Sequence, residues 1–334
     1  MTVNPLAALG RARLAQLGRE YMLAAHFSSR AGYACLRINH GDAAYKPVAI
    51  DNWMASSPVY APRMQRALGF DGNDNVAAIF KGLQLECGMP HQYMDARFAV
   101  DGHDEGRFWL DCCGPLVETE PRGEDAVRVM CHDIEDPTFD ATAVATNPRA
   151  RMRPVHRPPR RPADRSPHCE WRVFIDQDAE PIAMPPLAEE MAATELARLE
   201  LARFDANETG GMHLYDGPLL EQFQLELLSQ PALGLVCREL ALQAQLLTLS
   251  MAHVIARDYG RDAAMAVSEF QMVGSAWAVS ERLCRLLGLA GDSLDDIATV
   301  LGLHPALQPM EYFNWRLEAG EQSRLILRFP ESPA

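Results

Sequence analysis

The 334-residue sequence lacks the features that mark several large classes of protein. No window approaches 18 uninterrupted apolar residues, so no transmembrane helix is predicted. The N-terminal stretch MTVNPLAALGRARLAQLG contains neither a long apolar segment nor a small-residue cleavage site, and we expect no secretory signal. These absences favour a soluble, cytoplasmic protein without a membrane partner.

Positive charge is scarce as well. The chain has 31 Lys and Arg against 45 Asp and Glu, which gives a formal net charge of −14. Because phosphates are bound by concentrated Lys and Arg, we expect no nucleic-acid partner. The one basic run, 149–165, is Pro-rich and flanked by acidic sequence. This pattern is typical of a solvated loop, with an anion site as the alternative.

Several catalytic motifs are also missing. The sequence has no Gly-rich phosphate loop, no GxSxG and no HExxH, which disfavours nucleotide binding, that type of serine hydrolysis and zincin chemistry. It contains eight cysteines but no CxxC pair. In a chain of this length without a secretory signal, these predict reduced thiols or metal ligands rather than disulfides.

The composition that remains is that of a globular protein, with 48% apolar and 23% charged residues, long enough for one large domain or two of ordinary size. In the first half, periodicity predicts three helices, a hairpin and two further strands. The helices are 9–30, 48–68 ending at Gly69, and 75–83 with Asp74 or Asn73 as its cap; the strands are 93–100, 107–112, 126–131 and 170–175.

The stretch between Pro148 and Pro167 is too rich in proline for a helix or a central strand, and it predicts a long loop. The second half is mostly helical by pattern. Its expected helices are in 186–206, 218–260 with a break near Pro231, 262–287 and 294–301, followed by a hairpin of 312–318 and 324–328.

The two halves resemble each other. RMQRALGFDGNDNVAAIFKGLQL, from Arg63, matches RLCRLLGLAGDSLDDIATVLGLH, from Arg282, and places Gly69 and Gly288 219 residues apart. At the same spacing, Tyr93 and Arg97 match Tyr312 and Arg316. These matches indicate an internal duplication, with chance similarity of amphipathic helices as the alternative.

Upstream, His26 in MLAAHF resembles His253 in LSMAHV at a spacing of 227, which predicts eight extra residues near Tyr33 to Tyr45 in the first copy. We therefore expect an α+β fold of duplicated helix-plus-β-hairpin units. The first unit, 1–180, is completed by extra strands and the long Pro-rich loop, and it carries the site. The second, 181–334, is a degenerate, mostly helical unit with a C-terminal hairpin.

The residues most suited to chemistry lie at the ends of the predicted strands. Cys and His bind zinc or iron, and we predict a metal site from Cys112, Cys131, His168 and Cys169. Cys113 and His132 are the neighbours of two of them, and only one residue of each adjacent pair can face a common point on a strand.

Two alternatives stay open for these side chains. The cysteines can be small buried core residues, or Cys131 can be a catalytic nucleophile with His132 or His168 as its base and Asp133 shuttling protons. Asp133, Glu135 and Asp136 are candidates for a general acid or base, with a solvated acidic loop as the alternative. His26 and His253 are typical of core histidines.

One family shows a comparable order of motifs. The order of motifs is an expected strand ending in Cys131-His132-Asp133, a loop with Asn147-Pro148-Arg149, a Pro-rich insert and the closing run CEWRV from Cys169. This order resembles that of bacterial L-2-amino-thiazoline-4-carboxylate hydrolase-like proteins. Those are similar in turn to ligand-binding domains of the 4-vinyl-reductase type, some of which hold zinc through cysteines. The resemblance implies hydrolytic opening of a small cyclic C–N bond, with Cys131, Asp133 and Cys169 at the matched positions.

The sequence thus predicts a cytoplasmic, hydrolase-like enzyme for a small organic substrate, assisted by zinc or iron or by the Cys131 thiolate. One alternative is a non-catalytic protein that binds a small hydrophobic ligand and has a structural metal. Another is a subunit of a larger assembly, and a homo-oligomer is compatible with each of these functions.

Overall fold

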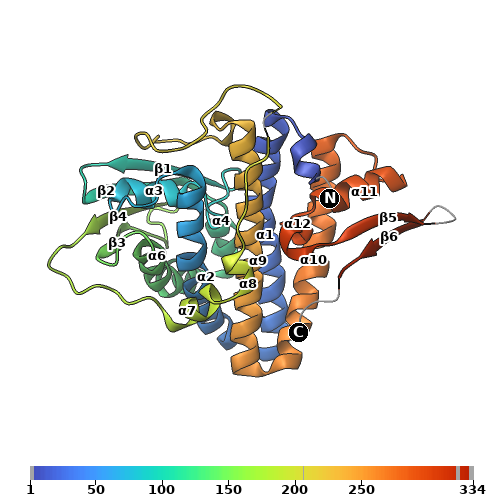
Figure 1. The fold of residues 1–334 in the computed structure, drawn as a ribbon. Coiled ribbons are helices and arrows are strands. Elements are labelled where there is room, and N and C mark those ends of the chain that lie inside the picture. Colours follow the sequence, from blue (N-terminus) through green and yellow to red (C-terminus); the bar gives the residue numbers. More distant parts are fainter. Residues whose placement is uncertain (1–3, 206, 321–323, 331–334) are drawn as a thin grey trace.

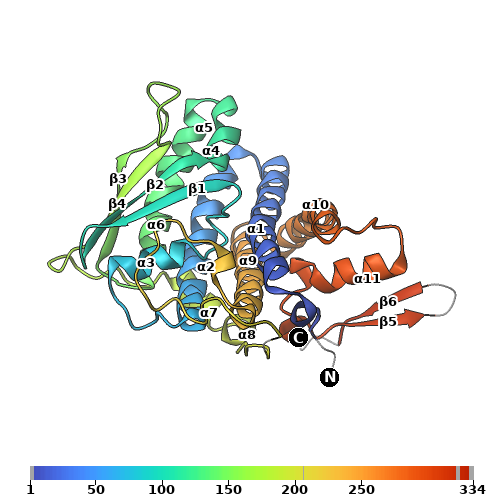
Figure 2. The same ribbon diagram turned by 90° about the horizontal axis from the view of Figure 1, so that it is seen from above.

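The computed structural model describes residues 4–205, 207–320 and 324–330. Long helices stand side by side at its centre, with a four-stranded sheet and short helices on one side and a two-stranded hairpin on the other (Figures 1 and 2). Helices and an antiparallel sheet form separate parts of the chain, so the predicted α+β class is confirmed.

Four helices form the centre: α1 (Arg11–His40), α2 (Tyr45–Leu68), α9 (Gln230–Tyr259) and α10 (Arg261–Leu287). α1 packs along α9. Each of these two helices also packs on the second long helix of the other half of the chain: α1 on α10, and α9 on α2. α1 and α2, although consecutive, hardly touch. The halves are therefore intertwined around one another.

The main hydrophobic cluster shows the same mixing. Its buried members come from both halves, among them Leu14, Leu17, Tyr21, Leu233, Leu240 and Leu283. Two glycines of α1 let neighbouring segments approach closely. A Cβ atom on Gly18 would lie 2.8 Å from the side chain of Leu225, which precedes α9, and one on Gly32 would lie 2.6 Å from the Met251 sulfur of α9. A larger side chain at Gly32 would therefore displace Met251 between α1 and α9.

The helix ends reveal a constant internal spacing. α1 and α9 both have 30 residues and end before Gly41 and Gly260, at φ 83° and 91°. α2 and α10 end before Gly69 and Gly288, which adopt nearly identical left-handed conformations, φ 72° and 71°. Both pairs of glycines are 219 residues apart. The predicted insertion of eight residues is wrong, and the counterpart of His26 at this spacing is Gln245 rather than His253.

The rest of each copy follows the same order with different detail. α3 (Val76–Leu83) and α11 (Leu294–Leu303) begin after Asn75 and Ser293, whose side chains accept hydrogen bonds from the third helical amides. Asn75, rather than the predicted Asp74 or Asn73, is therefore the cap. A hairpin follows in each copy, but Tyr312 lies in the short helix α12 (Met310–Phe313), not in a strand.

The large sheet has the order β1-β2-β4-β3 and is antiparallel throughout. Its strands are β1 (Met94–Val100), β2 (Glu105–Cys113), β3 (Ala150–His156) and β4 (Cys169–Ile175); the small sheet consists of β5 (Arg316–Gly320) and β6 (Arg324–Arg328). Part of the predicted loop is thus a strand. β3 tolerates Pro154 because it is at the edge of the sheet.

The segment 126–131, predicted as a strand, is helical. It spans α5 (Glu124–Arg128) and a π-helix (Val129–Ile134) that continues into α6 (Glu135–Val144). A short apolar run does not distinguish a buried strand from a buried helix, which explains the error. The remaining short helices are α4 (Gly114–Thr119), α7 (Pro186–Ala192) and α8 (Glu195–Arg198).

α9 begins at Gln230, with Pro231 in its first turn, so the predicted helix over 218–229 is absent from this described stretch apart from a 3₁₀ turn at Leu225–Leu227. α9 is long and apolar enough to cross a membrane by composition, but 78% of its most apolar window is buried inside the protein. This burial is typical of the core helix of a soluble protein. The structure does not contradict a soluble protein.

A buried ion pair joins the two halves. Arg63 on α2 donates to both carboxylate oxygens of Glu239 on α9, at 2.9 and 2.8 Å, and also to the carbonyls of Ala197 and Leu199. Both side chains are almost fully buried, at 5% and 6% exposed. Neither charge has water to solvate it if its partner is lost.

We predict that Glu239→Gln lowers the free energy of unfolding by about 3 kcal/mol, because it leaves the Arg63 guanidinium buried without a counter-charge. Urea unfolding followed by circular dichroism measures this loss. Asp51→Asn is the control, since it removes the half-exposed Arg257–Asp51 pair and should cost less than about 1 kcal/mol. Equal losses in the two variants would contradict the prediction.

Candidate functional site

A cavity of about 430 Å³ lies where α1 and α2 diverge. Its walls come from both helices, from the loop after α3, from β1, β2 and β4, and from the α4 to α6 segment. In the second copy, by contrast, the corresponding α9 and α10 pack against each other. The cavity is therefore built from the inserted residues 113–176 on one side and the first copy of the duplicated helices on the other.

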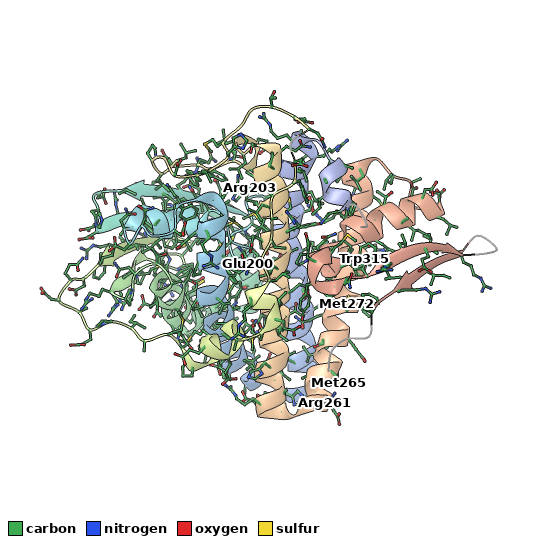
Figure 3. The ribbon with its side chains drawn as sticks, viewed as in Figure 1. Glu200, Arg203, Arg261, Met265, Met272 and Trp315 are labelled. Carbon is green, nitrogen blue, oxygen red and sulfur yellow. The ribbon has the colours of Figure 1, made fainter. Side chains whose placement is uncertain are left out.

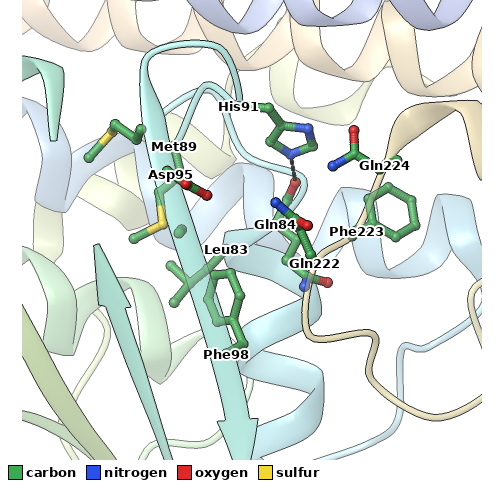
Figure 4. Close-up of a pocket in the computed structure, with 11 residues that line it drawn as sticks. Leu83, Gln84, Met89, His91, Asp95, Phe98, Gln222, Phe223 and Gln224 are labelled. Carbon is green, nitrogen blue, oxygen red and sulfur yellow. Dashed lines mark hydrogen bonds between the residues drawn. The ribbon is translucent and has the colours of Figure 1, made fainter. Parts of the chain in front are cut away.

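Most of the cavity wall is apolar or aromatic. Trp53, Tyr33 and Phe139 contribute rings, and Met89, Met94 and Met130 contribute flexible thioethers. A mostly apolar pocket of this size with a few polar groups is the usual form of a small-molecule site. Met89 and Met94 also border a smaller pocket of about 40 Å³ beside His91, whose Nε2 lies 2.7 Å from the carbonyl of Gln84 (Figure 4).

Two carboxyl groups in the cavity wall have no polar partner. Glu86, in the loop after α3, and Glu135, at the start of α6, accept no hydrogen bond and form no ion pair in the described part of the chain. Burial raises the pKa of each to about 8. For Glu135 the nearby Arg157 opposes this rise in pKa without cancelling it. Both side chains are therefore mostly protonated at neutral pH.

His26 on α1 is the third titratable group of the wall. Its Nε2 lies 3.3 Å from the carbonyl of Gly88, so in the neutral ring this nitrogen carries the proton and Nδ1 does not. Burial and, to a lesser degree, Arg30 lower the pKa of His26 to about 4. The imidazole is neutral across the physiological range.

Positive charge gathers at one end of the cavity. Arg30 is paired with Glu118 and also donates to the hydroxyl of Tyr93, which donates to Glu118 at 2.7 Å. Arg37 stacks over the Tyr45 ring at 3.8 Å, and its pKa is lowered by burial and by the nearby Arg122. With the carboxyls of Glu86 and Glu135 protonated, the lining has three guanidinium groups and one ionised carboxylate, and Asp42, outside the lining, also pairs with Arg37 at 3.4 Å. The cavity thus favours an anionic ligand although the chain is acidic.

The predicted catalytic triplet is not assembled at one point. Cys131 is buried within the π-helix, and burial raises the pKa of its thiol far above the usual range. His132 Nε2 lies 2.6 Å from the carbonyl of Pro158, and Asp133 forms a partly exposed ion pair with Lys46 at 2.9 Å. Consecutive residues of a helix point in different directions, which separates these three side chains.

The four predicted metal ligands are not brought together either. Cys112 is exposed, whereas its neighbour Cys113 faces the interior. His168 Nδ1 accepts a hydrogen bond from the Cys113 amide at 3.1 Å. Among the residues that the structure describes, no three His, Cys, Asp or Glu side chains form a group that could hold a metal ion. Cys112, Cys131, His168 and Cys169 therefore do not fit zinc or iron as a set.

The buried thiols do lie near one another. Cys113, Cys131 and Cys169 belong to one hydrophobic cluster, and the pKa of each is raised chiefly by burial and further by the proximity of Glu135. For Cys113 the value is about 12. Protonated thiols at neutral pH agree with the alternative of structural cysteines, and they disfavour a thiolate nucleophile.

The second copy contains a reduced counterpart of the cavity. A groove of about 60 Å³ between α1, α9 and α10 is lined by Gln245, Thr248, Ser268, Met272 and Pro305. Each of these lies 219 residues after a residue of the main cavity, namely His26, Ser29, Ala49, Trp53 and Glu86. The groove has no carboxyl or guanidinium group in its lining. The carboxyl and guanidinium groups belong to the first copy alone, and the titratable residue of the groove is His304, whose pKa burial lowers to about 4.

Sequence reasoning did not single out Glu86 or Arg30, and it gave Glu135 no preference over its acidic neighbours. Glu86 had one local signal, because it is an isolated charge within the apolar run LQLECGM. Comparisons of the chain with protein-family models, curated proteins and solved structures gave no match. The assignment of the site therefore depends on its geometry.

The raised pKa of Glu86 predicts a fall in stability with rising pH. In the unfolded chain this carboxyl loses its proton near pH 4.5, but in the folded protein it keeps it to about pH 8. Between these values the folded state binds more protons, so the free energy of unfolding decreases as pH rises, and it levels off above pH 8.

From pH 6.5 to 8.5 we expect Glu86 to contribute a loss of about 2 kcal/mol, which Glu86→Gln should remove. Urea unfolding at several pH values measures it. The window begins at pH 6.5 because buried His26, with its pKa lowered to about 4, gives the opposite trend below that value. An unchanged pH profile in the variant would show that Glu86 is ionised in the folded state.

Proposed function

We propose that the cavity is the active site of a hydrolase-like enzyme that opens a cyclic C–N bond in a small organic substrate. The observation that supports this most directly is the pair of unpartnered carboxyls, Glu86 and Glu135, in one mostly apolar cavity, each with a pKa of about 8. A general acid works best when its pKa is close to the working pH, and ordinary surface glutamates do not meet this condition.

The proposed reaction adds one water across the C–N bond. A protonated carboxyl donates its proton to the ring nitrogen as the bond to carbon breaks, while the oxygen of the water bonds to that carbon. The carboxylate formed, or the second carboxyl in its ionised state, takes the proton that the water loses. Neutral His26 lies in the same wall, and its unprotonated nitrogen can orient the water.

The lining also supports a substrate class. Trp53 and Phe139 provide flat apolar contacts for a ring, and Arg30, Arg37 and Arg122 favour a negative group on it. The proposal therefore combines a small heterocycle with a carboxylate. This agrees with the activity that the resemblance to L-2-amino-thiazoline-4-carboxylate hydrolase-like proteins implies.

The proton transfers are assigned to the carboxyls rather than to His132 and Asp133, because neither of these two lines the cavity. Cys131 is not required as a nucleophile, since burial favours its neutral thiol. We also propose a cytoplasmic location. It is supported by the eight cysteines, all of which are free, as expected in a reducing compartment.

A non-catalytic ligand-binding protein is the second candidate, and the apolar lining favours it. The two functions differ in what happens to a bound heterocycle. A binding protein returns the ligand unchanged, whereas the enzyme adds a water to it. The role of a subunit in a larger assembly is compatible with either function.

The proposed function predicts turnover of at least one member of a panel of small cyclic amidines, amides and thiazolines that carry a carboxylate. Mass spectrometry detects the product as the addition of one water. Glu135→Gln and Glu86→Gln should each lower kcat about 10² to 10⁴ fold, because the amide cannot transfer a proton. Glu124→Gln, which alters an exposed glutamate paired with Arg161, is the control and should keep full activity. Tight binding of panel members without turnover would instead support the binding protein.

The metal-assisted version has a separate test, which is elemental analysis of the purified protein. It requires about one zinc or iron per chain, lost in Cys131→Ala while circular dichroism shows an intact fold. Loss of both metal and fold in Cys131→Ala would identify a structural ion. Turnover of the panel by a metal-free protein would exclude the metal-assisted version and support the carboxyl mechanism.

A further inference from the structure

One end of the cavity holds hydrogen-bond donors that have no acceptor. Arg37 on α1 and Tyr45 on α2 line it from the helical side, and Arg122 lines it from the 3₁₀ turn after α4. Neither guanidinium group nor the Tyr45 hydroxyl makes a hydrogen bond in the described part of the chain. Nε of Arg37 is buried, and buried polar atoms are nearly always hydrogen-bonded.

Other arginines of the chain do have acceptors. Arg203, labelled in Figure 3, donates to two backbone carbonyls at 2.7 and 2.6 Å. In the cavity wall, Arg30 is paired with Glu118, so its charge is neutralised. The lining thus contains one arginine whose donors are satisfied and two whose donors are not.

The three side chains with free donors are held close together. The guanidinium carbon of Arg37 lies 3.8 Å from the centroid of the Tyr45 ring, and Tyr33 packs edge-on against the same ring at 5.1 Å. Burial and, after it, the positive charge of Arg122 lower the pKa of Arg37. Burial raises the pKa of Tyr45, whereas the two arginines oppose this rise. The guanidinium group of Arg122 is therefore near both other side chains.

The counter-charge at this end is weak. The carboxylate of Asp42 lies 3.4 Å from Nε of Arg37, but the contact is not a hydrogen bond, and the Asp42 side chain is 86% exposed. An exposed pair of this kind contributes little free energy. Arg122 forms no ion pair in the described part of the chain. Positive charge and free donors therefore remain at this end of the cavity.

From these contacts we propose that Arg37, Tyr45 and Arg122 form the subsite that binds the carboxylate of the substrate. A carboxylate has two oxygens with about four acceptor positions, so it can accept from both guanidinium groups and from the hydroxyl. Arg30 stays with Glu118 and is not part of the subsite. The inference rests on the proposed function, because it concerns the carboxylate of the heterocycle assigned there.

The subsite also distinguishes the two protonated carboxyls. Glu135 is near the Tyr45 hydroxyl, since its charge adds to the rise in the pKa of that group. Glu86 lies beside Gly88, where a Cβ atom would be 2.8 Å from its carboxyl oxygen, and the carbonyl of Gly88 faces His26 at 3.3 Å. A substrate held by its carboxylate at the subsite thus has Glu135 as the adjacent acid.

Benzoate and benzamide test the subsite, because they share one ring and differ in the charged group. Saturation-transfer NMR on the full chain measures both dissociation constants. We expect the wild type to bind benzoate at least tenfold more tightly than benzamide. Arg37→Met and Arg122→Met should each raise the dissociation constant of benzoate at least tenfold, and Tyr45→Phe about fivefold, with smaller effects on benzamide.

Arg161→Met is the matched control. Arg161 is an exposed arginine like Arg122, but it lies outside the cavity lining, so its loss should change the affinity for benzoate less than twofold. Circular dichroism checks the fold of each variant, and the exposed position of Arg122 makes it the safest replacement. Equal affinities of the wild type for benzoate and benzamide would overturn the subsite, as would equal effects of Arg122→Met and Arg161→Met.

Failure of the subsite and failure of the proposed hydrolase give different results, because benzoate has no C–N bond to hydrolyse. Turnover of the heterocycle panel without a preference for benzoate over benzamide would overturn the subsite and leave the hydrolase supported. Benzoate binding that depends on all three side chains, in a protein that hydrolyses no panel member, would support the subsite and count against the hydrolase.

Discussion

The close packing of α1 against α9 is the contact on which the other parts depend. It includes a close approach of Gly32 to Met251, and it brings the first helix of each copy to the centre. Each central helix then takes the second helix of the opposite copy as its neighbour. As a result α2 is held at a distance from α1 by α9, and the space between α1 and α2 becomes the cavity. The site is thus a consequence of how the copies interlock.

The cavity combines this space with a chemically different wall. The helical side supplies His26, Arg30 and Arg37, and the inserted segment supplies Glu135 and Glu118. Because burial disfavours the charged forms, the carboxyls of Glu86 and Glu135 keep their protons and the imidazole of His26 stays neutral. The guanidinium groups stay charged, since their pKa is too high for burial to neutralise them. Burial thus neutralises the carboxyls but not the guanidinium groups, and this difference makes the cavity positive.

Much of the fold was predictable from sequence because its signals are local. The glycine stops at Gly69 and Gly288, the helical periodicity around them and the first hairpin depend on neighbouring residues only. The duplication was visible in the same residues. The alignment upstream of these residues was wrong. His26 was aligned with His253 because similar apolar residues surround them, whereas the correct alignment follows from the ends of α1 and α9, which only the structure locates.

The site was predictable only in part. The region 126–175 does supply Glu135 and Cys169 to the cavity wall, and β4 was foreseen. The helical state of 126–131 was not, and on the expected strand Cys131 and Asp133 would share one face, with His132 on the other. Glu86 and the arginines of α1 come from distant segments, and their importance arises from burial in a shared space. Tertiary packing decides that burial, and periodicity does not report it.

The exchange of partners between the copies also bears on how such a chain could arise. One copy alone would expose the faces of both its long helices, since α1 meets α10 and α2 meets α9. Two separate identical copies would restore both contacts and would form two equivalent clefts. Joining them in one chain replaces a bimolecular encounter by an intramolecular one with a high effective concentration. It also frees each cleft to change on its own, so that one can be enlarged into a cavity while the other closes to a groove.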